Sequence, residues 1–445
     1  MTSQRLVVIG GGAAGPSSAA EAKRRNRSLD VTMIEGGDFV SYAACPMPYY
    51  IGDVIKDYKR LVIRTPEEFQ KTGINVKTRT RVEEIDPGKG LVRLSDESTL
   101  PYDILVMGTG SSAIRLDIPG ADLEGVFVLK NLSDALRMKA YLNDTNCRKA
   151  AIVGGGYIAM EMSEALRKLG IETSVVVRRN RPVVRWDEAF TDLILEELRK
   201  NDVSFQAETR LQSIEKGTSS RFLLRTDKGD MDADMVLLGL GVCANVTLAK
   251  SMGLEIGATG AIKVDSRQQT SREGVYAVGD CCEVFHRIAR QWVHLPLGDI
   301  ANKQGRVAGQ NIGGKPAEFP GVVGAQSFKV FDLEVGTTGL TEDEAVQYGF
   351  NPVSTLIWGS PVARPMVQGQ KIGVKLVADK VTGKLLGGQC IGEKGAIQRT
   401  YALSVALWSG LGIEEVGYLD LPYAPPFGGA WDAIHVAAQE IVKKR

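Results

Sequence analysis

A single cysteine, Cys45, is the residue whose position in this sequence most favours redox chemistry. It stands in residues 41–50, Ser-Tyr-Ala-Ala-Cys-Pro-Met-Pro-Tyr-Tyr, hereafter the cysteine segment. Because proline suits the first turn of a helix, Pro46 predicts that Cys45 lies at a helix N-terminus. The positive end of a helix dipole favours a thiolate, so we expect a lowered thiol pKa. The alternative interpretation is a buried structural cysteine.

A glycine-rich turn precedes the cysteine segment and joins an apolar strand at residues 6–9 to a helix. Gly10 permits a tight turn, Gly12 lets the backbone approach a pyrophosphate, and Gly15 lets the helix pack close to the strand. The next strand ends in a carboxylate that can accept hydrogen bonds from ribose hydroxyls. Together these features make a dinucleotide-binding fingerprint. Its expected contact residues are Gly10, Gly12, Ala13, Ala14, Gly15 and Glu35.

A second unit of the same kind begins with a strand at residues 150–153 and a turn at residues 154–159, so two dinucleotides are expected. Its second strand ends at Arg178 and Arg179, where the first unit has Glu35. Two guanidinium groups can bind a 2′-phosphate, which favours NADPH over NADH. The alternative is a pair of solvated charges at a strand end. The expected contact residues are Gly154, Gly156, Tyr157, Ile158, Arg178, Arg179 and Gly241.

Two further motifs complete an informative order along the chain. A buried strand ends in Gly-Thr-Gly at residues 108–110, and a later strand runs into Gly279-Asp280, whose acid suits a ribityl hydroxyl. The order of the four motifs resembles the two-dinucleotide-binding flavoprotein superfamily, in which the first and last motifs hold FAD and the inserted one holds NAD(P)H. This resemblance implies further FAD contacts at Val82, Gly108, Thr109, Gly110, Asp280 and Gly298.

The resemblance also implies the architecture. We expect an α/β protein with two nested Rossmann-like dinucleotide-binding domains and a C-terminal α+β dimerisation domain. The expected FAD-binding domain is split between residues 1–113 and 250–325, the NAD(P)H-binding domain covers 114–249, and the dimerisation domain covers 326–445.

The cysteine segment assigns the chain to a branch of this superfamily. Dithiol members carry Cys-x4-Cys, but here the second position is Tyr50, which excludes an internal disulfide at this site. The segment resembles the branch of coenzyme A disulfide reductases, NADH oxidases and NADH peroxidases, with Pro46 in place of the usual glycine. Oxidases and peroxidases of this branch place a histidine where this chain has Ala13, which counts against peroxide reduction.

A C-terminal stretch, Tyr-Ala-Pro-Pro-Phe at residues 423–427, resembles an element of the coenzyme A disulfide reductases. In those enzymes the tyrosine enters the partner subunit's site, so the resemblance implies a homodimer in which Tyr423 serves the departing sulfur. It also implies that coenzyme A phosphates contact Arg24, Ser17 and Ser41. The alternative for Arg24 is that basic residues at a helix C-terminus simply complement the helix dipole.

The resemblance therefore implies NAD(P)H-dependent reduction of coenzyme A disulfide, or of a related small disulfide, persulfide or polysulfide, through a mixed disulfide at Cys45. One alternative is an NAD(P)H oxidase or peroxidase that uses a Cys45 sulfenic acid. An alternative of another class is a redox-responsive flavin-binding regulatory protein.

Composition restricts the remaining possibilities. The 445 residues carry a formal net charge of +1, which gives no global field to attract nucleic acid or a membrane surface. No apolar run of about 18 residues and no leader are evident, so we expect a cytoplasmic protein. The six cysteines show no disulfide framework or zinc spacing and the three histidines are scattered, so we expect no metal site.

Overall fold

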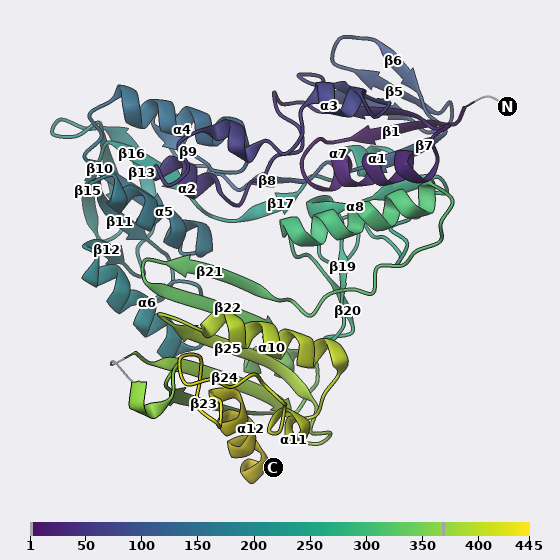
Figure 1. Ribbon diagram of the computed structural model, residues 1–445. Helices are drawn as coiled ribbons and strands as arrows, with labels where there is room; N and C mark the ends of the chain where they lie inside the picture. The colour runs from purple at the N-terminus through teal and green to yellow at the C-terminus, as the bar shows by residue number, and fades with distance from the viewer. Residues whose placement is uncertain (1–2, 367–369) are drawn as a thin grey trace.

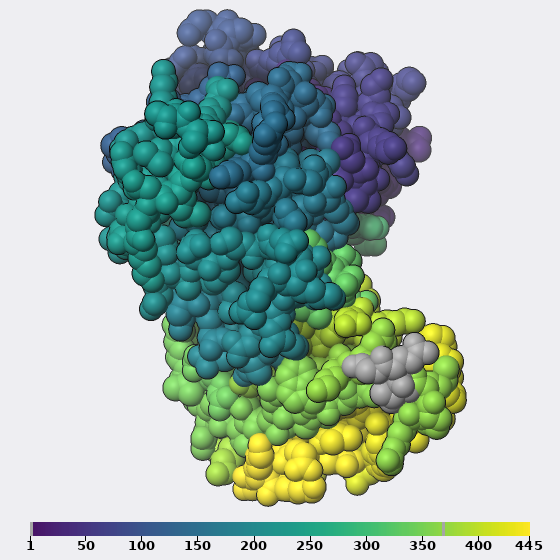
Figure 2. All heavy atoms as spheres, turned by 90° about the vertical axis from the view of Figure 1, so that its left-hand side faces the viewer, coloured from purple at the N-terminus to yellow at the C-terminus, as the bar shows by residue number. Residues whose placement is uncertain are grey.

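The structure, a computed structural model, describes residues 3–366 and 370–445. Within these ranges, three five-stranded sheets dominate the architecture, and the C-terminal one lies at the end of the molecule opposite the N-terminus (Figure 1). A space-filling view shows the residues around the second of these sheets, coloured blue to teal, above the C-terminal part, coloured green to yellow (Figure 2). None of the helices in the described ranges is long and apolar enough to cross a membrane.

The first sheet is parallel and begins with the N-terminal strand. Apolar side chains fill β1, where Leu6 and Val8 are fully buried. In sheet order the strands are β18 (Val275–Ala277), β7 (Ile104–Met107), β1 (Arg5–Ile9), β2 (Asp30–Ile34) and β3 (Ile74–Lys77). Strand β18 returns to this sheet after the chain has built the second one. A smaller antiparallel sheet follows β3, with β4 (Val82–Asp86), β5 (Leu91–Leu94) and β6 (Thr99–Pro101).

Two helices pack against each other over the first sheet, α1 (Ala14–Arg25) and α8 (Gly298–Ile312). Their close approach requires small residues at the crossing. An added Cβ at Gly309 would lie 2.6 Å from the carbonyl oxygen of Ser18, and one at Gly305 would overlap the carbonyl oxygen of Ala14. The helix that carries the first glycine turn is therefore supported by a segment about 290 residues further along the chain.

The second sheet is also parallel. Its strands are β12 (Val203–Gln206), β11 (Glu172–Val176), β10 (Lys149–Val153), β16 (Met235–Leu238) and β9 (Val126–Phe127). Its helices are α4 (Leu132–Asp144), α5 (Tyr157–Lys168) and α6 (Glu188–Lys200). An antiparallel sheet of β13 (Leu211–Lys216), β14 (Phe222–Thr226) and β15 (Gly229–Ala233) accompanies them.

Two short antiparallel strands carry the chain from the first sheet to the second and back. They are β8 (Ser111–Ala113) and β17 (Val242–Ala244), and their register pairs Ala113 with Val242. The two connections therefore run side by side. After them come α7 (Thr247–Ser251), the 3-10 turn η2 (Gly279–Cys281), β19 (Val284–His286) and β20 (Gln291–Val293).

The third sheet is antiparallel and belongs to the C-terminal part. Its strands are β21 (Gln326–Val330), β22 (Leu333–Gly339), β25 (Leu385–Gly392), β24 (Ile372–Asp379) and β23 (Pro352–Gly359). Its helices are α9 (Glu342–Gln347), α10 (Ala396–Ser409), α11 (Ile413–Val416) and α12 (Ala433–Lys444). The expected fold class, two nested α/β units followed by an α+β unit, is confirmed. The expected domain boundaries stay a prediction.

Candidate active site

Different glycines of the two turns have different roles: some allow close packing of the backbone, and others leave open space. Gly10 has a positive φ of 105°, and an added Cβ there would overlap the carbonyl oxygen of Gly108. An added Cβ at Gly15 would overlap the carbonyl oxygen of Gly10, so both positions need glycine for packing. In contrast, nothing lies within 4 Å of a Cβ at Gly12 or at Gly156. These two backbone positions face open space, as a bound pyrophosphate requires.

Glu35 lies just beyond β2 and is held by the backbone around the first turn. Its Oε2 accepts a hydrogen bond of 2.6 Å from the N–H of Gly11, and its Oε1 accepts one of 2.7 Å from the N–H of Gly37. Charge-assisted bonds of this kind fix the carboxylate beside the turn. The geometry fits the acidic position of a dinucleotide fingerprint, and the open cradle at Gly12 fits the pyrophosphate of FAD.

Asp280 belongs to η2 and faces the connection between the two parallel sheets. Its Oδ2 accepts hydrogen bonds from Ser111 Oγ at 2.7 Å and from Lys130 Nζ at 2.9 Å. Lys130 precedes α4, so this contact joins the part of the molecule around the second sheet to the part around the first sheet. Sequence reasoning did not find Lys130, because a lone lysine before a helix cap carries no motif. On the neighbouring Gly-Thr-Gly turn, Thr109 Oγ1 donates to the carbonyl oxygen of Asn245 at 2.7 Å.

The other expected nucleotide contacts lie around the same two turns. Ala13 is the N-cap of α1 and Ala14 is its first residue. Gly110 and Gly241 have positive φ angles of 67° and 96° and immediately precede β8 and β17. Gly298 begins α8, and Val82 begins β4.

The second nucleotide-binding unit places its expected contacts similarly. Gly154 has a positive φ of 124°, and Ile158 is half-buried in the first turn of α5. Arg178 and Arg179 are exposed just beyond β11.

The cysteine segment ends in a short helix, α2 (Met47–Ile51). Pro46 is the N-cap residue of α2, and a second proline, Pro48, occupies the first turn. Cys45 therefore lies one residue before the cap, and the expectation that Pro46 sits inside the first turn is wrong by one position. The Cys45 thiol is free and exposed, so the alternative of a buried structural cysteine is wrong.

The expected lowering of the Cys45 pKa is also wrong for this chain. Desolvation by neighbouring atoms and the charge of Glu161 raise the pKa of the Cys45 thiol, with Asp299 and Asp280 adding to the effect. Although the side chain is exposed, the surrounding groups still remove part of its water. A five-residue helix that starts after the cap contributes too little to reverse these effects.

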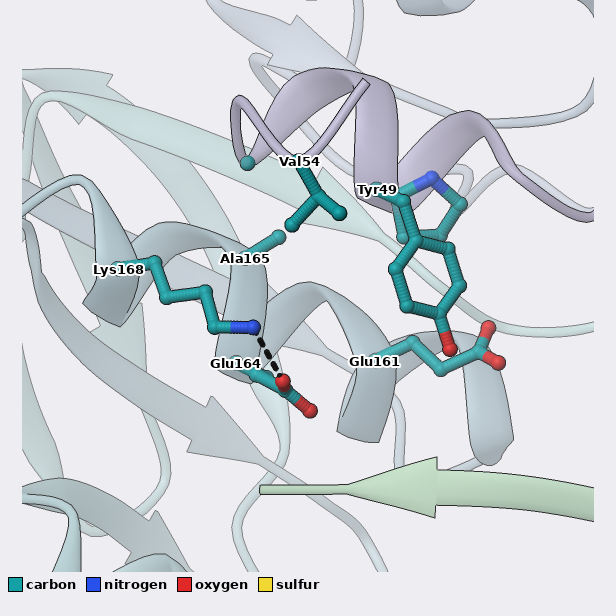
Figure 3. Close-up of a pocket in the computed structure, with 8 residues that line it drawn as sticks. Tyr49, Val54, Glu161, Glu164, Ala165 and Lys168 are labelled. Carbon is teal, nitrogen blue, oxygen red and sulfur yellow. Dashed lines mark hydrogen bonds and ion pairs between the residues drawn. The ribbon is translucent and has the colours of Figure 1, made fainter. Parts of the chain in front are cut away.

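Helix α2 packs against α5, one of the helices of the second sheet, and the two helices run in the same direction. An added Cβ at Gly52 would lie 2.9 Å from the Cα atom of Ala165, which fixes the close approach at one end. One turn earlier, the ring of Tyr49 points from α2 toward Glu161 on α5 (Figure 3). These residues line a narrow cleft of about 10 Å³, which has room for about one water.

Glu161 is the titratable group that sequence reasoning missed. Burial and the charge of Glu164 raise the pKa of Glu161 to about 7. Burial also raises the pKa of Tyr157, with the charges of Cys45 and Glu161 adding to it, so these three side chains share one environment. The only sequence signal was position, since Glu161 follows Tyr157 by four residues and lies on the same helix face.

The expected coenzyme A contacts lie along α1 and its surroundings. Arg24 is paired with the buried Glu21, yet 62% of its side chain remains exposed. Ser17 Oγ donates to Asn302 Oδ1 on α8 at 2.7 Å. Ser41 has a positive φ of 49°, and its N–H donates to the carbonyl oxygen of Gly11 at 2.7 Å. Ser17 and Ser41 therefore lie near the first glycine turn, whereas Arg24 lies in the last turn of α1, at the other end of the helix. The side chains of Arg24 and Ser17 already have polar partners within the chain.

Tyr423 is not brought to Cys45 of the same chain. It is 56% exposed and lies in the segment between α11 and α12, at the far end of the molecule from α1 and α2 (Figure 1). It lines a cavity of about 370 Å³ together with Phe427 and the buried ion pair of Arg399 and Asp432. A contact between Tyr423 and Cys45 would therefore require a second copy of the chain.

Comparison with known proteins identifies the family. Residues 4–305 match the profile described as pyridine nucleotide-disulphide oxidoreductase. The chain belongs to this family. Residues 325–434 match the dimerisation domain of the same family. The chain is therefore an oxidoreductase with binding sites for FAD and NAD(P)H and a dimerisation domain, as the order of the motifs predicted.

Two relatives are similar over nearly their full length. The NAD(P)H sulfur oxidoreductase (CoA-dependent) of Pyrococcus furiosus is 37% identical over 99% of this chain and 99% of its own length. The coenzyme A disulfide reductase of Staphylococcus aureus (strain JH9) is 25% identical over 97% of this chain and 98% of its own.

Solved structures show the same similarity. An NAD-dependent persulfide reductase from A. fulgidus superposes with a TM-score of 0.95 at 33% identity, covering 99% of this chain and 83% of that chain. The water-forming NADH oxidase from Lactobacillus brevis, bound to NADH, gives a TM-score of 0.94 at 27% identity over 99% of both chains. An engineered NADPH oxidase made from it, bound to NADPH, gives the same values. The engineered form carries one aspartate-to-alanine and one glycine-to-alanine change and two changes to arginine among its five substitutions.

Proposed function

We propose that this chain is an NAD(P)H-dependent flavoprotein that reduces coenzyme A disulfide, or a related small disulfide, persulfide or polysulfide, through a mixed disulfide at Cys45. The observation that carries the proposal is a free, exposed Cys45 just before α2, the helix that packs on α5 after the second nucleotide turn, with Tyr50 where a partner cysteine would stand. A thiol without an internal partner can form a mixed disulfide with a sulfur atom of the substrate. The names of the similar P. furiosus and S. aureus proteins support the same substrate class.

The residues of the chain perform the exchange and hold its parts in place. The Cys45 thiolate attacks one sulfur of a disulfide R–S–S–R, forms Cys45–S–S–R and releases R–S⁻. When bound, FAD and the reduced nicotinamide supply the electron pair that reduces the mixed disulfide. Gly12 and Gly156 leave room for the two pyrophosphates, and the α2–α5 contact fixes the cysteine segment between the two turns.

The coenzyme A part of the proposal concerns the helix that carries the first turn. The exposed guanidinium of Arg24 on α1 is available to a phosphate group, although it must share its charge with Glu21. Ser17, near the start of α1, and Ser41, whose N–H donates to Gly11, offer hydroxyl groups near the glycine turn at the other end of this helix. These three residues support a phosphate-bearing thiol substrate at this position.

For the nicotinamide, we favour NADPH over NADH. Arg178 and Arg179 are exposed beyond β11, and Val177 stands where a carboxylate would repel a 2′-phosphate. The engineered NADPH oxidase supports this choice, because its substitutions remove an aspartate and add arginines. The third glycine of the second fingerprint is already an alanine in this chain, Ala159.

The active unit that we propose is a homodimer in which Tyr423 of one chain completes the site of the other. Its exposure, its cavity and its distance along the molecule from α2 support a role in the partner's site. Its phenol O–H would donate to the departing sulfur and stabilise the thiolate.

The decisive test is the covalent state of Cys45. Mass spectrometry of the denatured, unreduced protein is expected to show an adduct with the mass of coenzyme A on the Cys45 peptide, and C45S is expected to lose all disulfide turnover. A sulfenic acid at Cys45 with rapid oxygen consumption would support the oxidase alternative instead. Turnover well below about 1 s⁻¹ with every small disulfide tested would favour the regulatory alternative.

A further inference from the structure

Lys139 of α4 is a buried lysine whose ammonium group contacts the C-terminal end of α2, the helix that follows Cys45. Only 11% of its side chain is exposed, which is rare for a lysine unless the charge is paired. Its Nζ donates to the carbonyl oxygen of Ile51 at 2.9 Å and lies 2.9 Å from Oδ1 of Asp53. These contacts join a helix of the second sheet to α2, which lies beside it (Figure 1).

The last turn of α2 leaves one carbonyl group for this lysine. The carbonyl oxygens of Pro48, Tyr49 and Tyr50 accept hydrogen bonds from backbone N–H groups at 2.9, 2.9 and 3.3 Å. In the part of the chain that the structure describes, no backbone N–H reaches the carbonyl oxygen of Ile51, which accepts from Lys139 instead. A cation at the C-terminal end of a helix also complements the helix dipole. The lysine therefore completes the end of α2.

The start of α4 holds a second group of the site. Lys130 Nζ donates to Oδ2 of Asp280, the expected FAD contact, at 2.9 Å. The backbone of Lys130 is itself fixed, because its N–H donates to Oδ2 of Asp134 in the first turn of α4 at 3.1 Å. Helix α4 thus contacts the expected flavin site through Lys130 and the end of α2 through Lys139. Because a single helix carries both contacts, it fixes the separation between them.

We propose that Lys139 is a positioning residue for Cys45, an inference that rests on the proposed function. Its contacts hold the C-terminal end of α2 on α4, while Gly52 packs closely against Ala165 on α5. With this end held on two sides, Cys45 at the other end of α2 keeps a constant place relative to Asp280. Sulfur exchange requires aligned atoms, and a displacement of about 1 Å can lower a rate about 100-fold.

The apolar side of α2 stays anchored when the ammonium group is removed. Met47, Tyr50 and Ile51 belong to the same buried cluster as Met138 of α4. The variant K139M keeps an unbranched apolar side chain, so we expect it to fold. The carbonyl oxygen of Ile51 then lacks a donor, and a buried acceptor without a donor is unfavourable. The last turn of α2 is therefore expected to open more often.

The test measures two half-reactions of the FAD-loaded enzyme by anaerobic stopped-flow absorbance, after dithiothreitol has freed Cys45 and has been removed. Reduction of the flavin by NADPH needs no cysteine, whereas its reoxidation by coenzyme A disulfide passes through Cys45. In K139M we expect the first rate to stay within about twofold of the wild-type rate and the second to fall about 10- to 100-fold. Hydrogen exchange is expected to accelerate at the amides of residues 49–55 and to stay unchanged in α5.

The matched control is R137A, because Arg137 is an exposed cation of α4 that pairs with Asp134 of the same helix. It is expected to match the wild type in both half-reactions. K139Q retains an N–H donor, so we expect a smaller loss than in K139M, confined to reoxidation. Flavin content and the midpoint of thermal unfolding show whether K139M has folded, and K139Q takes its place in the test if it has not.

Equal losses in the two half-reactions, an unchanged reoxidation rate, or the same loss in R137A would overturn the proposal. Failure of the proposed function has a different signature, because C45S would then still reoxidise its flavin with coenzyme A disulfide at the wild-type rate.

Discussion

Replacing Gly12 by alanine tests whether the open space at the first turn is the FAD cradle. A Cβ at this position meets no atom within 4 Å, and the backbone φ is not positive, so the apoprotein itself accommodates alanine. A glycine-to-alanine change at a compatible position stabilises a fold by about 0.4–1 kcal/mol. A methyl group pressed against a bound pyrophosphate instead introduces overpacking of about 1–3 kcal/mol, which corresponds to a roughly 5- to 150-fold loss of FAD affinity.

The assay separates the two effects by measuring apoprotein stability and FAD affinity independently. Thermal unfolding of apo G12A is expected to match or exceed that of the wild-type apoprotein, while fluorescence titration shows the weakened binding of FAD. G15A is the matched control, since an added Cβ there would overlap the carbonyl oxygen of Gly10 and must destabilise the apoprotein. The reasoning is refuted if G12A binds FAD as tightly as the wild type, or if apo G12A is destabilised as much as apo G15A.

Three further predictions address other parts of the molecule. R178A and R179A are each expected to lower kcat/KM for NADPH about 10- to 150-fold and to leave the value for NADH nearly unchanged, since a hydrogen bond to a charged group contributes about 1.5–3 kcal/mol. Equal losses with both nucleotides would contradict the NADPH choice. Y423F is expected to slow disulfide turnover while the coenzyme A adduct on Cys45 persists, and unchanged turnover would remove Tyr423 from the site. The hydrogen-bonded ion pair of Asp103 with Arg5 lowers the pKa of Asp103 to about 2. The stabilising effect of this ion pair should therefore be complete above about pH 4 and lost as the pH falls toward 2. The difference in unfolding midpoint between the wild type and D103N should shrink over that range, and a constant difference would contradict the assignment.

The sequence predicted the elements whose signals are local. Apolar runs ending in glycine turns located β1 and β10, and the strand after each turn was found to within a few residues. Such segments are predictable because the turn, the helix start and the strand are encoded within about 30 residues. The order of the motifs then predicted the nesting of the two units, which strand β18 displays by joining the first sheet after the second has been completed.

The electrostatics of the site could not be predicted from local signals. The helix after Cys45 was expected, but it begins at Met47, so Pro46 is the N-cap residue and does not lie in the first turn. Proline is compatible with both positions, so the sequence could not distinguish them. The thiol pKa was expected in the wrong direction because desolvation and the charge of Glu161 depend on how α2 packs against α5. Lys130 and Glu161 carry no motif, and only tertiary contacts reveal what they face.

The side-by-side pairing of β8 and β17 makes the inserted half a topological cassette, entered and left at neighbouring points. A direct link between Ala113 and Val242 would bypass the whole insert, and chain connectivity alone would permit it. Without the insert, the cysteine segment would lose its packing, because Met47, Tyr50 and Ile51 of α2 are buried in the same hydrophobic core as the second sheet and its helices. The reactive thiol is thus encoded next to one nucleotide site and anchored in the scaffold of the other. Removing the insert would therefore also remove the packing partners of the helix that follows Cys45.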